Sequence, residues 1–112
     1  MKPALLVIDI QKAFFGHDQL TTQSLERAIE YVNAAIKLFR SKQLPVVAIQ
    51  HMDPEDQLVP GTEGFALPEQ LAILDSDLHI VKTYGNAFNQ TPLAGELRAL
   101  GVDTIIITGF TA

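Results

Sequence analysis

The chain has no cysteine among its 112 residues, and this absence removes several kinds of chemistry. No disulfide can form, no zinc can be held by thiolates, and no thiol nucleophile can come from these residues. The sequence also lacks any cluster of Lys and Arg, with 13 acidic and 8 basic residues and a net charge of -5. Since a phosphate backbone is bound by a basic surface, we expect no nucleic-acid partner.

Long apolar runs are missing as well. The run near the start, residues 4–8, ends when Asp9 interrupts it. A signal peptide needs a longer apolar region and a membrane span needs roughly 20 apolar residues, so we expect a soluble, cytoplasmic protein with no membrane partner. The length and a hydrophobic content of 47% fit one modest core, and residues 1–112 are therefore expected to be a single domain or part of one.

Motifs for common cofactors and metals are absent too. No G-x-G-x-x-G and no phosphate-binding lysine motif occur, which disfavours a nucleotide cofactor. The three histidines, His17, His51 and His79, lack the spacing and the neighbouring acids of a metal site, so structural or exposed roles are expected of them. His51 is the most interesting of the three because it ends a predicted strand. We expect no cofactor and no metal.

What the sequence does contain is a set of short runs rich in Val, Ile and Leu. Such runs predict parallel strands that are buried on both faces. Between the first two, apolar residues recur every three or four positions from Thr22 to Ser41, which predicts an amphipathic helix with Thr22 as its N-cap. Thr91-Pro92 and Gly101 are typical of the start and the end of a shorter helix. The predicted strands are residues 4–8, 46–49, 79–82 and 102–108.

The order strand, helix, strand, loop, strand, helix, strand predicts a doubly wound parallel α/β sheet. Residues 53–77 contain too many prolines and glycines for a long element, with at most one helical turn at residues 69–71, and a connection of this length is often functional or a lid. Four strands with only two helices would leave one face of the sheet largely bare. This predicts a C-terminally incomplete domain, or a partner subunit that covers the bare face; we favour missing sequence and also expect a homo-oligomer.

Two charged residues lie at the ends of predicted strands. Asp9 follows residues 4–8 directly, and Lys82 ends residues 79–82. Because the carboxyl ends of parallel strands share the edge of the sheet where ligands bind, both side chains are expected in one crevice. Such a pair can keep a nucleophile anionic or polarise a substrate oxygen. The plainer alternatives are an aspartate that caps a turn and a surface lysine.

The turn Gly109-Phe110-Thr111 leaves the last predicted strand at the same edge. Its backbone N–H groups could form an oxyanion site, although an ordinary loop would have the same sequence. Phe14 and Phe88 follow the two charged residues within a short distance along the chain and could wall a small apolar pocket, with Phe15 a weaker candidate. As core residues they would look the same in the sequence.

In combination, these segments resemble the isochorismatase-like cysteine hydrolases. The resemblance runs in order along the whole chain, and it is the combination that is specific, since no single segment would be diagnostic. The segments that carry it are residues 4–14 with Asp9-Ile10-Gln11, then Pro60-Gly61-Thr62-Glu63-Gly64, Lys82, Asn86-Ala87-Phe88, Thr91-Pro92-Leu93, and Gly101-Val102-Asp103 to Thr108-Gly109-Phe110-Thr111.

The resemblance implies a three-layer α/β/α domain with an Asp-Lys-Cys triad, in which Asp9 is the general base and Lys82 the lysine. The cysteine would follow at about position 115, so this chain would be a truncated and inactive portion of a hydrolase. In the family, the thiolate attacks an amide or imide carbon and water hydrolyses the thioester, which implies a small-molecule substrate with a C–N bond. The resemblance also implies a costly cis peptide at Phe110–Thr111 that aims N–H groups at the oxyanion.

The pocket and the metal question follow from the same resemblance. We expect Gln11 and His51 to join Phe14 and Phe88 in lining the substrate pocket. The nicotinamidase branch of the family binds a metal through an aspartate and histidines after the second strand. At the matching place this sequence has His51-Met52-Asp53, so that metal site is not carried over.

Other functional interpretations stay open at this point. A second branch of the fold lacks the cysteine and hydrolyses the vinyl ether of isochorismate, with the aspartate as proton donor. The residues of this chain do not separate the two branches, and the cysteine type is favoured because it is the more numerous. The remaining alternatives are a truncated fragment that folds only by oligomerising or remains inert, and a flavodoxin-like module that binds an anionic ligand at the same strand ends.

Overall fold

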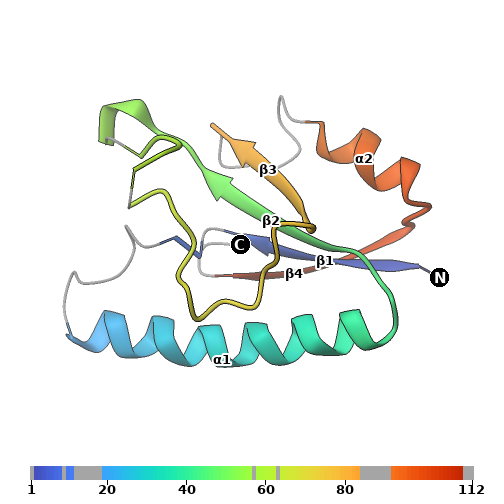
Figure 1. Cartoon of the computed structure of the whole chain (residues 1–112), viewed down its shortest axis with the longest axis horizontal. Coiled ribbons are helices and arrows are strands. Elements are labelled where there is room, and N and C mark those ends of the chain that lie inside the picture. Colours follow the sequence, from blue (N-terminus) through green and yellow to red (C-terminus); the bar gives the residue numbers. More distant parts are fainter. Residues whose placement is uncertain are drawn as a thin grey trace.

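The computed structural model describes residues 2–8, 10–11, 19–56, 58–62, 64–83 and 92–109. Among them, four parallel strands form one sheet in the order β3-β2-β1-β4 (Figure 1). The fold is therefore the predicted doubly wound α/β sheet. Its elements are β1 (Pro3–Ile8), α1 (Gln19–Ser41), β2 (Val46–His51), the 3-10 turn η2 (Pro54–Asp56), β3 (Leu78–Lys82), α2 (Leu93–Ala99) and β4 (Thr104–Gly109).

The central strand β1 explains why its sequence is continuously apolar. Leu5 and Val7 pack into the cluster that includes α1, whereas Leu6 and Ile8 pack into the cluster that includes α2. Successive side chains of a strand point to opposite faces, so both faces of β1 are buried and neither can be polar. The α1 cluster contains Ile29, Val32, Ile36 and Phe39, and the α2 cluster contains Leu93 and Leu97.

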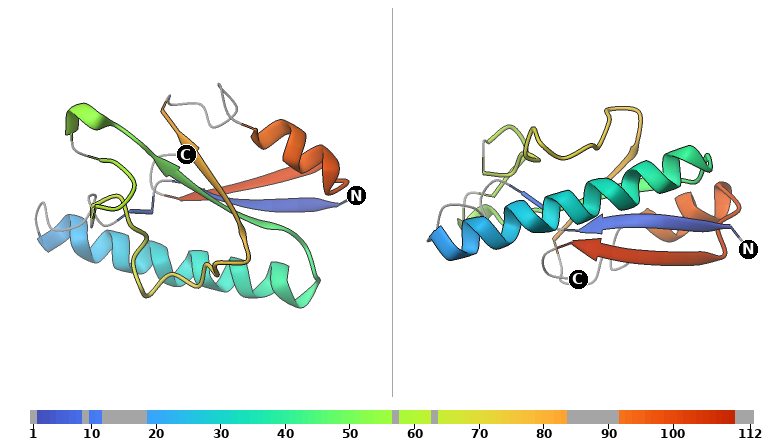
Figure 2. Two further views of the ribbon diagram at one scale, coloured as in Figure 1. Left: turned by 45° about the horizontal axis from the view of Figure 1, so that its top comes forward. Right: turned by 90° about the horizontal axis from the view of Figure 1, so that it is seen from below.

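The expectation of one largely bare face is wrong. Helix α1 covers one face and α2 covers the other, as the two apolar clusters and Figure 2 show. Exposed apolar side chains lie instead on the edge strands of the sheet: Val81 of β3 is 39% exposed, and on β4 Ile106 is 47% and Ile107 is 48% exposed. These two neighbours point to opposite faces, so the exposure concerns the edge of the sheet and not one whole face.

Both helices differ from the predictions at their starts. Helix α1 begins at Gln19, so Thr22 lies inside the helix and is not its N-cap. The apolar periodicity starts only at Leu25, and the first turn therefore has no signal of its own. Helix α2 begins at Leu93 with Pro92 in the N-cap position. Its end at Gly101 is confirmed, because this residue takes a left-handed φ of 74° and its N–H bonds to the carbonyl of Arg98.

The long connection between β2 and β3 contains no regular element beyond η2 among its described residues, as the prolines and glycines predict. The expected helical turn at residues 69–71 is a non-helical turn, in which the N–H of Leu71 bonds to the carbonyl of Pro68. The connection runs from the carboxyl ends of the strands down to α1 and back to the start of β3 (Figure 1). Its Leu71 is buried in the α1 cluster, so it helps α1 to cover that face.

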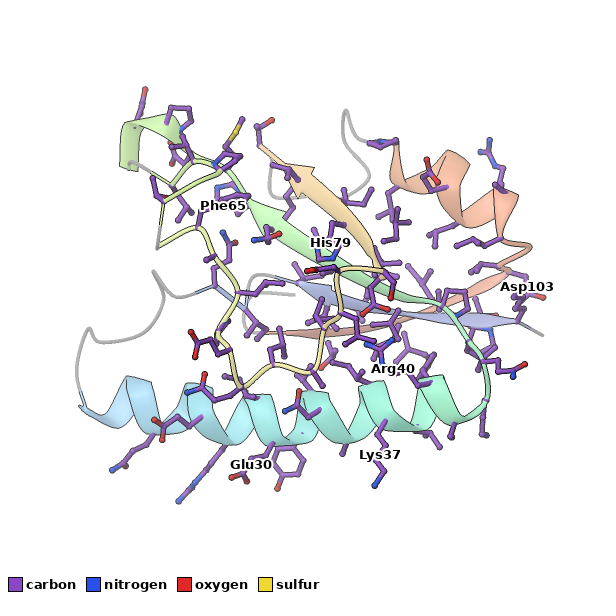
Figure 3. The ribbon with its side chains drawn as sticks, in the orientation of Figure 1. Glu30, Lys37, Arg40, Phe65, His79 and Asp103 are labelled. Atoms are coloured by element: carbon purple, nitrogen blue, oxygen red, sulfur yellow. The ribbon has the colours of Figure 1, made fainter. Side chains whose placement is uncertain are left out.

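Two side chains of α1 hold this connection. The carboxamide of Asn33 donates to the carbonyl of Gln70 and accepts from the N–H of Ala72, at 2.8 Å each. Arg40 donates to both carboxylate oxygens of Asp77, at 2.8 and 2.7 Å, and to the carbonyl of Ala72 (Figure 3). Burial opposes the charged form of Asp77, but hydrogen bonds from Arg40 and from the N–H of Leu74 outweigh it and lower the pKa of the carboxyl.

No helix in the described part of the chain is long and apolar enough to span a bilayer.

Candidate functional site

The carboxyl ends of all four strands lie at one edge of the sheet. The register pairs Ile8 of β1 with Ile49 of β2 and with Gly109 of β4, and it pairs His51 with Lys82 of β3. Strands β2 and β3 extend the sheet to one side of β1 and β4 extends it to the other, so the strand order reverses between β1 and β4. Open α/β sheets bind ligands at this kind of switch point, outside the carboxyl ends of the strands.

Lys82 lies at this edge and is buried. It is the last residue of β3, as predicted, and only 3% of its surface is exposed. Its Nζ lies 3.5 Å from Nδ1 of His51, which is the last residue of β2. Because an ammonium group can only donate hydrogen bonds, Nδ1 must be the acceptor and a neutral imidazole would carry its proton on Nε2. Lysine is almost never buried without a specific partner, so this placement marks the edge as a candidate site.

Gln11 is completely buried at the same edge. Its Nε2 donates to the carbonyls of His51 and Phe65, at 3.0 Å each. Its Oε1 accepts from the N–H of His51 at 2.7 Å. The carboxamide of Gln50, which is 8% exposed, also donates to the carbonyl of Phe65, at 2.9 Å. These contacts join the segment after β1, the end of β2 and the middle of the long connection, in which Phe65 lies (Figure 3).

Several predicted site residues lie outside the described part of the chain. Asp9, Phe14, Phe88, Phe110 and Thr111 all belong to this group, as does the weaker candidate Phe15; His17, expected in a structural or exposed role, also lies outside it. The Asp9–Lys82 pair, the aromatic pocket, the oxyanion turn and its cis peptide therefore stay predictions. The same holds for the expected substrate contacts of Gln11 and His51. What the structure brings together at the edge is Gln11, Gln50, His51, Phe65 and Lys82.

Sequence reasoning did not single out Gln50 and Phe65. Gln50 was detectable in principle, because a polar side chain inside an apolar strand needs a hydrogen-bond partner when it is buried. Phe65 takes part through its backbone carbonyl, which any residue carries, so its side chain gave no signal. His79, expected in a structural or exposed role, has its Nε2 3.0 Å from the carbonyl of Leu74, away from the site (Figure 3).

Two hollows in the described surface lie away from this edge. The larger one, of about 670 Å³, lies between α1 and the long connection and is lined by Glu26, Ile29, Glu30, Asn33, Pro68, Glu69 and Gln70. A smaller one, of about 230 Å³, lies between α2 and the start of β4. The strand ends and the buried lysine mark the site, because the two aromatic residues expected to wall a pocket there, Phe14 and Phe88, are outside the described ranges. The described residues also contain no group of three His, Cys, Asp or Glu side chains that could hold a metal.

Comparison with known proteins agrees with this architecture. Residues 3–112 match the family model of the isochorismatase domain. The chain belongs to the isochorismatase family. Members of this family are hydrolases, and the predicted resemblance is confirmed at that level.

Two curated relatives come from Bacillus subtilis (strain 168). The uncharacterised isochorismatase family protein YrdC is 33% identical over 112 residues, which cover 98% of this chain and 59% of the relative. The uncharacterised isochorismatase family protein YddQ is also 33% identical, with 97% of this chain and 62% of the relative covered. This isochorismatase-family chain thus spans less than two thirds of the length of these relatives.

Solved structures give the same fold. The crystal structure of an isochorismatase family protein has a TM-score of 0.84 and 32% identity, and the match covers 96% of this chain and 63% of that one. The N-carbamoylsarcosine amidase from Thermoplasma acidophilum has a TM-score of 0.84 and 29% identity, with 97% and 68% covered. The three-layer α/β/α architecture is therefore shared along nearly the whole chain.

Proposed function

We propose that the protein hydrolyses a carbon–nitrogen bond of a small amide, with Asp9 as the general base and Lys82 as the cation of the site. The observation that carries this proposal is the burial of Lys82 at the carboxyl end of β3, on the same edge of the sheet as the switch point between β1 and β4. The similarity to an N-carbamoylsarcosine amidase supports the choice of a C–N bond. Asp9 is assigned by its position directly after β1.

A buried ammonium group suits this reaction because water screens its positive charge only weakly, so that it can stabilise a nearby anion. In a site of low dielectric, a fixed positive charge near a thiolate or a developing oxyanion lowers the barrier more than it would in water. The contact with Nδ1 of His51 fixes one of the three Nζ–H directions, although it is long at 3.5 Å. The lysine thereby acts as a positioned cation.

The nucleophile decides between two routes. In the thioester route, Asp9 removes the thiol proton and sulfur bonds to the carbonyl carbon. The C–N electron pair leaves with nitrogen, to which Asp9 gives the proton it took from the thiol. Water then hydrolyses the C–S bond of the thioester. Because the 112 residues include no cysteine, this thiol has to come from a part of the protein outside them. Direct attack by water would use the same base and the same cation.

The assay that tests the proposal uses the product of the natural gene, with its intact mass measured. We would incubate it with an N-carbamoyl amino acid, a primary aromatic amide and a cyclic imide, and measure the amine, ammonia or ring-opened product. Hydrolysis of at least one of these is expected. Pyruvate release from isochorismate without any amide hydrolysis would overturn the C–N assignment in favour of vinyl-ether chemistry. No hydrolysis of either class would overturn the hydrolase assignment.

The same assay on the 112-residue chain separates the two routes. The thioester route predicts no turnover by this chain, because it has no thiol. Amide hydrolysis by protein of the matching mass would exclude that route and leave direct attack by water.

A further inference from the structure

We propose that Gln11 is a positioning residue of the site, whose carboxamide holds His51 and the long connection in place beside Lys82. The inference rests on the proposed function only where it concerns turnover. The positioning itself follows from hydrogen bonds among described residues. It gives Gln11 a role through the backbone of the site, in addition to any contact with substrate.

The Gln11 carboxamide takes the place of the backbone partner that β1 no longer provides for β2. The regular pairing of β1 with β2 is recorded up to Ile8 and Ile49, two residues before His51. Gln11 then accepts from the N–H of His51 at 2.7 Å and donates to the carbonyl of the same residue at 3.0 Å. A primary amide offers the donor and the acceptor that a neighbouring strand would offer. The side chain thus continues the pairing of β2 after the backbone pairing has ended.

The opposite side of the same segment is held by β3. His51 pairs with Lys82 in the register of β2 and β3, and the N–H of Met52 bonds to the carbonyl of Lys82 at 2.7 Å. His51 is therefore fixed between Gln11 on one side and β3 on the other. Because the backbone is fixed on both sides, the point from which the imidazole reaches the lysine is fixed as well.

The second hydrogen bond that Gln11 donates holds the long connection between β2 and β3. The carbonyl of Phe65 accepts from Gln11 at 3.0 Å and from Gln50 at 2.9 Å, and the Phe65 side chain is 8% exposed. Two buried amides on one carbonyl fix the connection at the carboxyl edge, 54 residues from Gln11 along the chain. Asn33 holds the connection independently at α1, through the backbone of Gln70 and Ala72.

The arrangement predicts a specific consequence for Gln11→Met, which keeps the length of the side chain but replaces the carboxamide with an apolar group and removes all three hydrogen bonds. The N–H and carbonyl of His51 would lose their partners on the β1 side, whereas Phe65 would keep Gln50. The expected defect is therefore larger at the end of β2 than in the middle of the strand. Asn33→Ala is the matched control, because it removes two hydrogen bonds to the same connection without touching His51.

The experiment has one arm that needs no substrate. Amide hydrogen exchange is measured by NMR on the purified chain for His51 and for Val47, a fully buried residue in β2. In Gln11→Met, the protection of His51 should fall on the order of 10-fold more than that of Val47, and in Asn33→Ala the ratio of the two should stay at the wild-type value. Equal loss at both amides in Gln11→Met would mean general destabilisation and would overturn the proposal.

The second arm uses the full-length protein with whichever amide it hydrolyses. A positioning role predicts that Gln11→Met lowers kcat on the order of 10-fold or more with a much smaller change in KM, while Asn33→Ala keeps both. An unchanged kcat, or a change in KM alone, would contradict the positioning role even if amide hydrolysis is confirmed. If no amide is hydrolysed, the proposed function fails while the exchange arm still decides whether Gln11 holds His51.

Discussion

The two ends of the sheet stabilise the protein in different ways. At the carboxyl end, polar side chains are buried: Gln11 is 0%, Lys82 3% and Gln50 8% exposed. At the amino end, Lys2 and Asp103 are both exposed, yet they join β1 to the segment before β4. There the N–H of Lys2 donates to the carboxylate of Asp103 at 2.8 Å, and its Nζ bonds to the carbonyl of Leu100.

The difference has a physical meaning. Exposed charged and polar groups can form hydrogen bonds at little desolvation cost. The contacts at the amino end of the sheet are therefore of the kind found on any protein surface. Burying a lysine and two carboxamides is costly unless each finds partners, and apolar residues would pack there more cheaply. Polar groups buried at the ligand-binding end of an α/β sheet are therefore better explained by function than by stability.

The largest expected effect is on catalysis at the carboxyl end. In the full-length protein, Lys82→Ala should lower kcat for amide hydrolysis on the order of 10³-fold, because the fixed positive charge that stabilises the reacting anion is lost. Steady-state kinetics measure this. The control is Lys37→Ala, since Lys37 is exposed on α1 and points away from the sheet (Figure 3). A Lys82→Ala variant with the turnover of Lys37→Ala would remove the functional contrast between the two ends.

The next effect is on stability at the same end. Gln11→Leu should lower the free energy of unfolding by roughly 2–4 kcal/mol, because it orphans the N–H and carbonyl of the His51 backbone and leaves one hydrogen bond fewer at Phe65. Urea denaturation gives this value. Gln23→Leu on the exposed face of α1 is the matched control and should change stability by less than about 0.5 kcal/mol. Equal effects of the two changes would show that the buried carboxamide contributes nothing special.

A smaller effect concerns the half-buried pair that holds the connection to α1. The pKa of Asp77 is lowered in the folded state, so its contribution is present above its unfolded pKa and is lost as the pH falls through the folded one. Near pH 7 the free energy of unfolding of the wild type should be higher than that of Asp77→Asn by roughly 1–2 kcal/mol. That difference should begin to shrink near pH 4, the ordinary pKa of an unfolded aspartate, and should be lost once the pH falls below the lowered pKa of folded Asp77. Denaturation of both proteins at several pH values tests this, and a difference that does not depend on pH would contradict it.

The smallest effect is expected at the exposed amino end. The hydrogen bond from the N–H of Lys2, followed by that from the Thr104 hydroxyl, lowers the pKa of Asp103. Asp103→Asn should therefore lower the melting temperature at pH 7 by less than Asp77→Asn does, and the effect should disappear in acid. Calorimetry at pH 7 and in acid compares the two variants. A larger loss at Asp103 than at Asp77 would reverse the ranking of the two regions.

The sequence predicted what depends on local pattern. The apolar runs located the strands, and the residues that end them, His51 and Lys82, were placed correctly at the carboxyl edge. The hydrogen bonds of Gln11 could not be predicted. Their backbone partners lie 40 and 54 positions further along the chain, and every residue has such backbone groups. Thr22 was placed at the start of α1 because the first turn of that helix has no apolar residue in phase with the rest.

The coverage of the sheet was predictable in principle. The chain moves from β1 to β2 in one direction and from β3 to β4 in the other. Since parallel crossovers are right-handed, α1 and α2 must then lie on opposite faces. The expectation of a bare face was wrong because it rested on the number of helices alone. The strand order decides on which face of the sheet each helix lies. Within the described sheet, exposed apolar side chains lie on the two edge strands, at Ile106 and Ile107 of β4 and at Val81 of β3.

The central claim is that residues from the ends of β1 and β3 act as one hydrolytic unit, and a double-mutant cycle tests it most directly. We would measure kcat for amide hydrolysis in the full-length protein and in Asp9→Asn, Lys82→Ala and the double variant. Groups that act together are strongly non-additive, so the double variant should be no slower than the slower single variant. Losses that multiply, or a single variant with the parent rate, would contradict the claim.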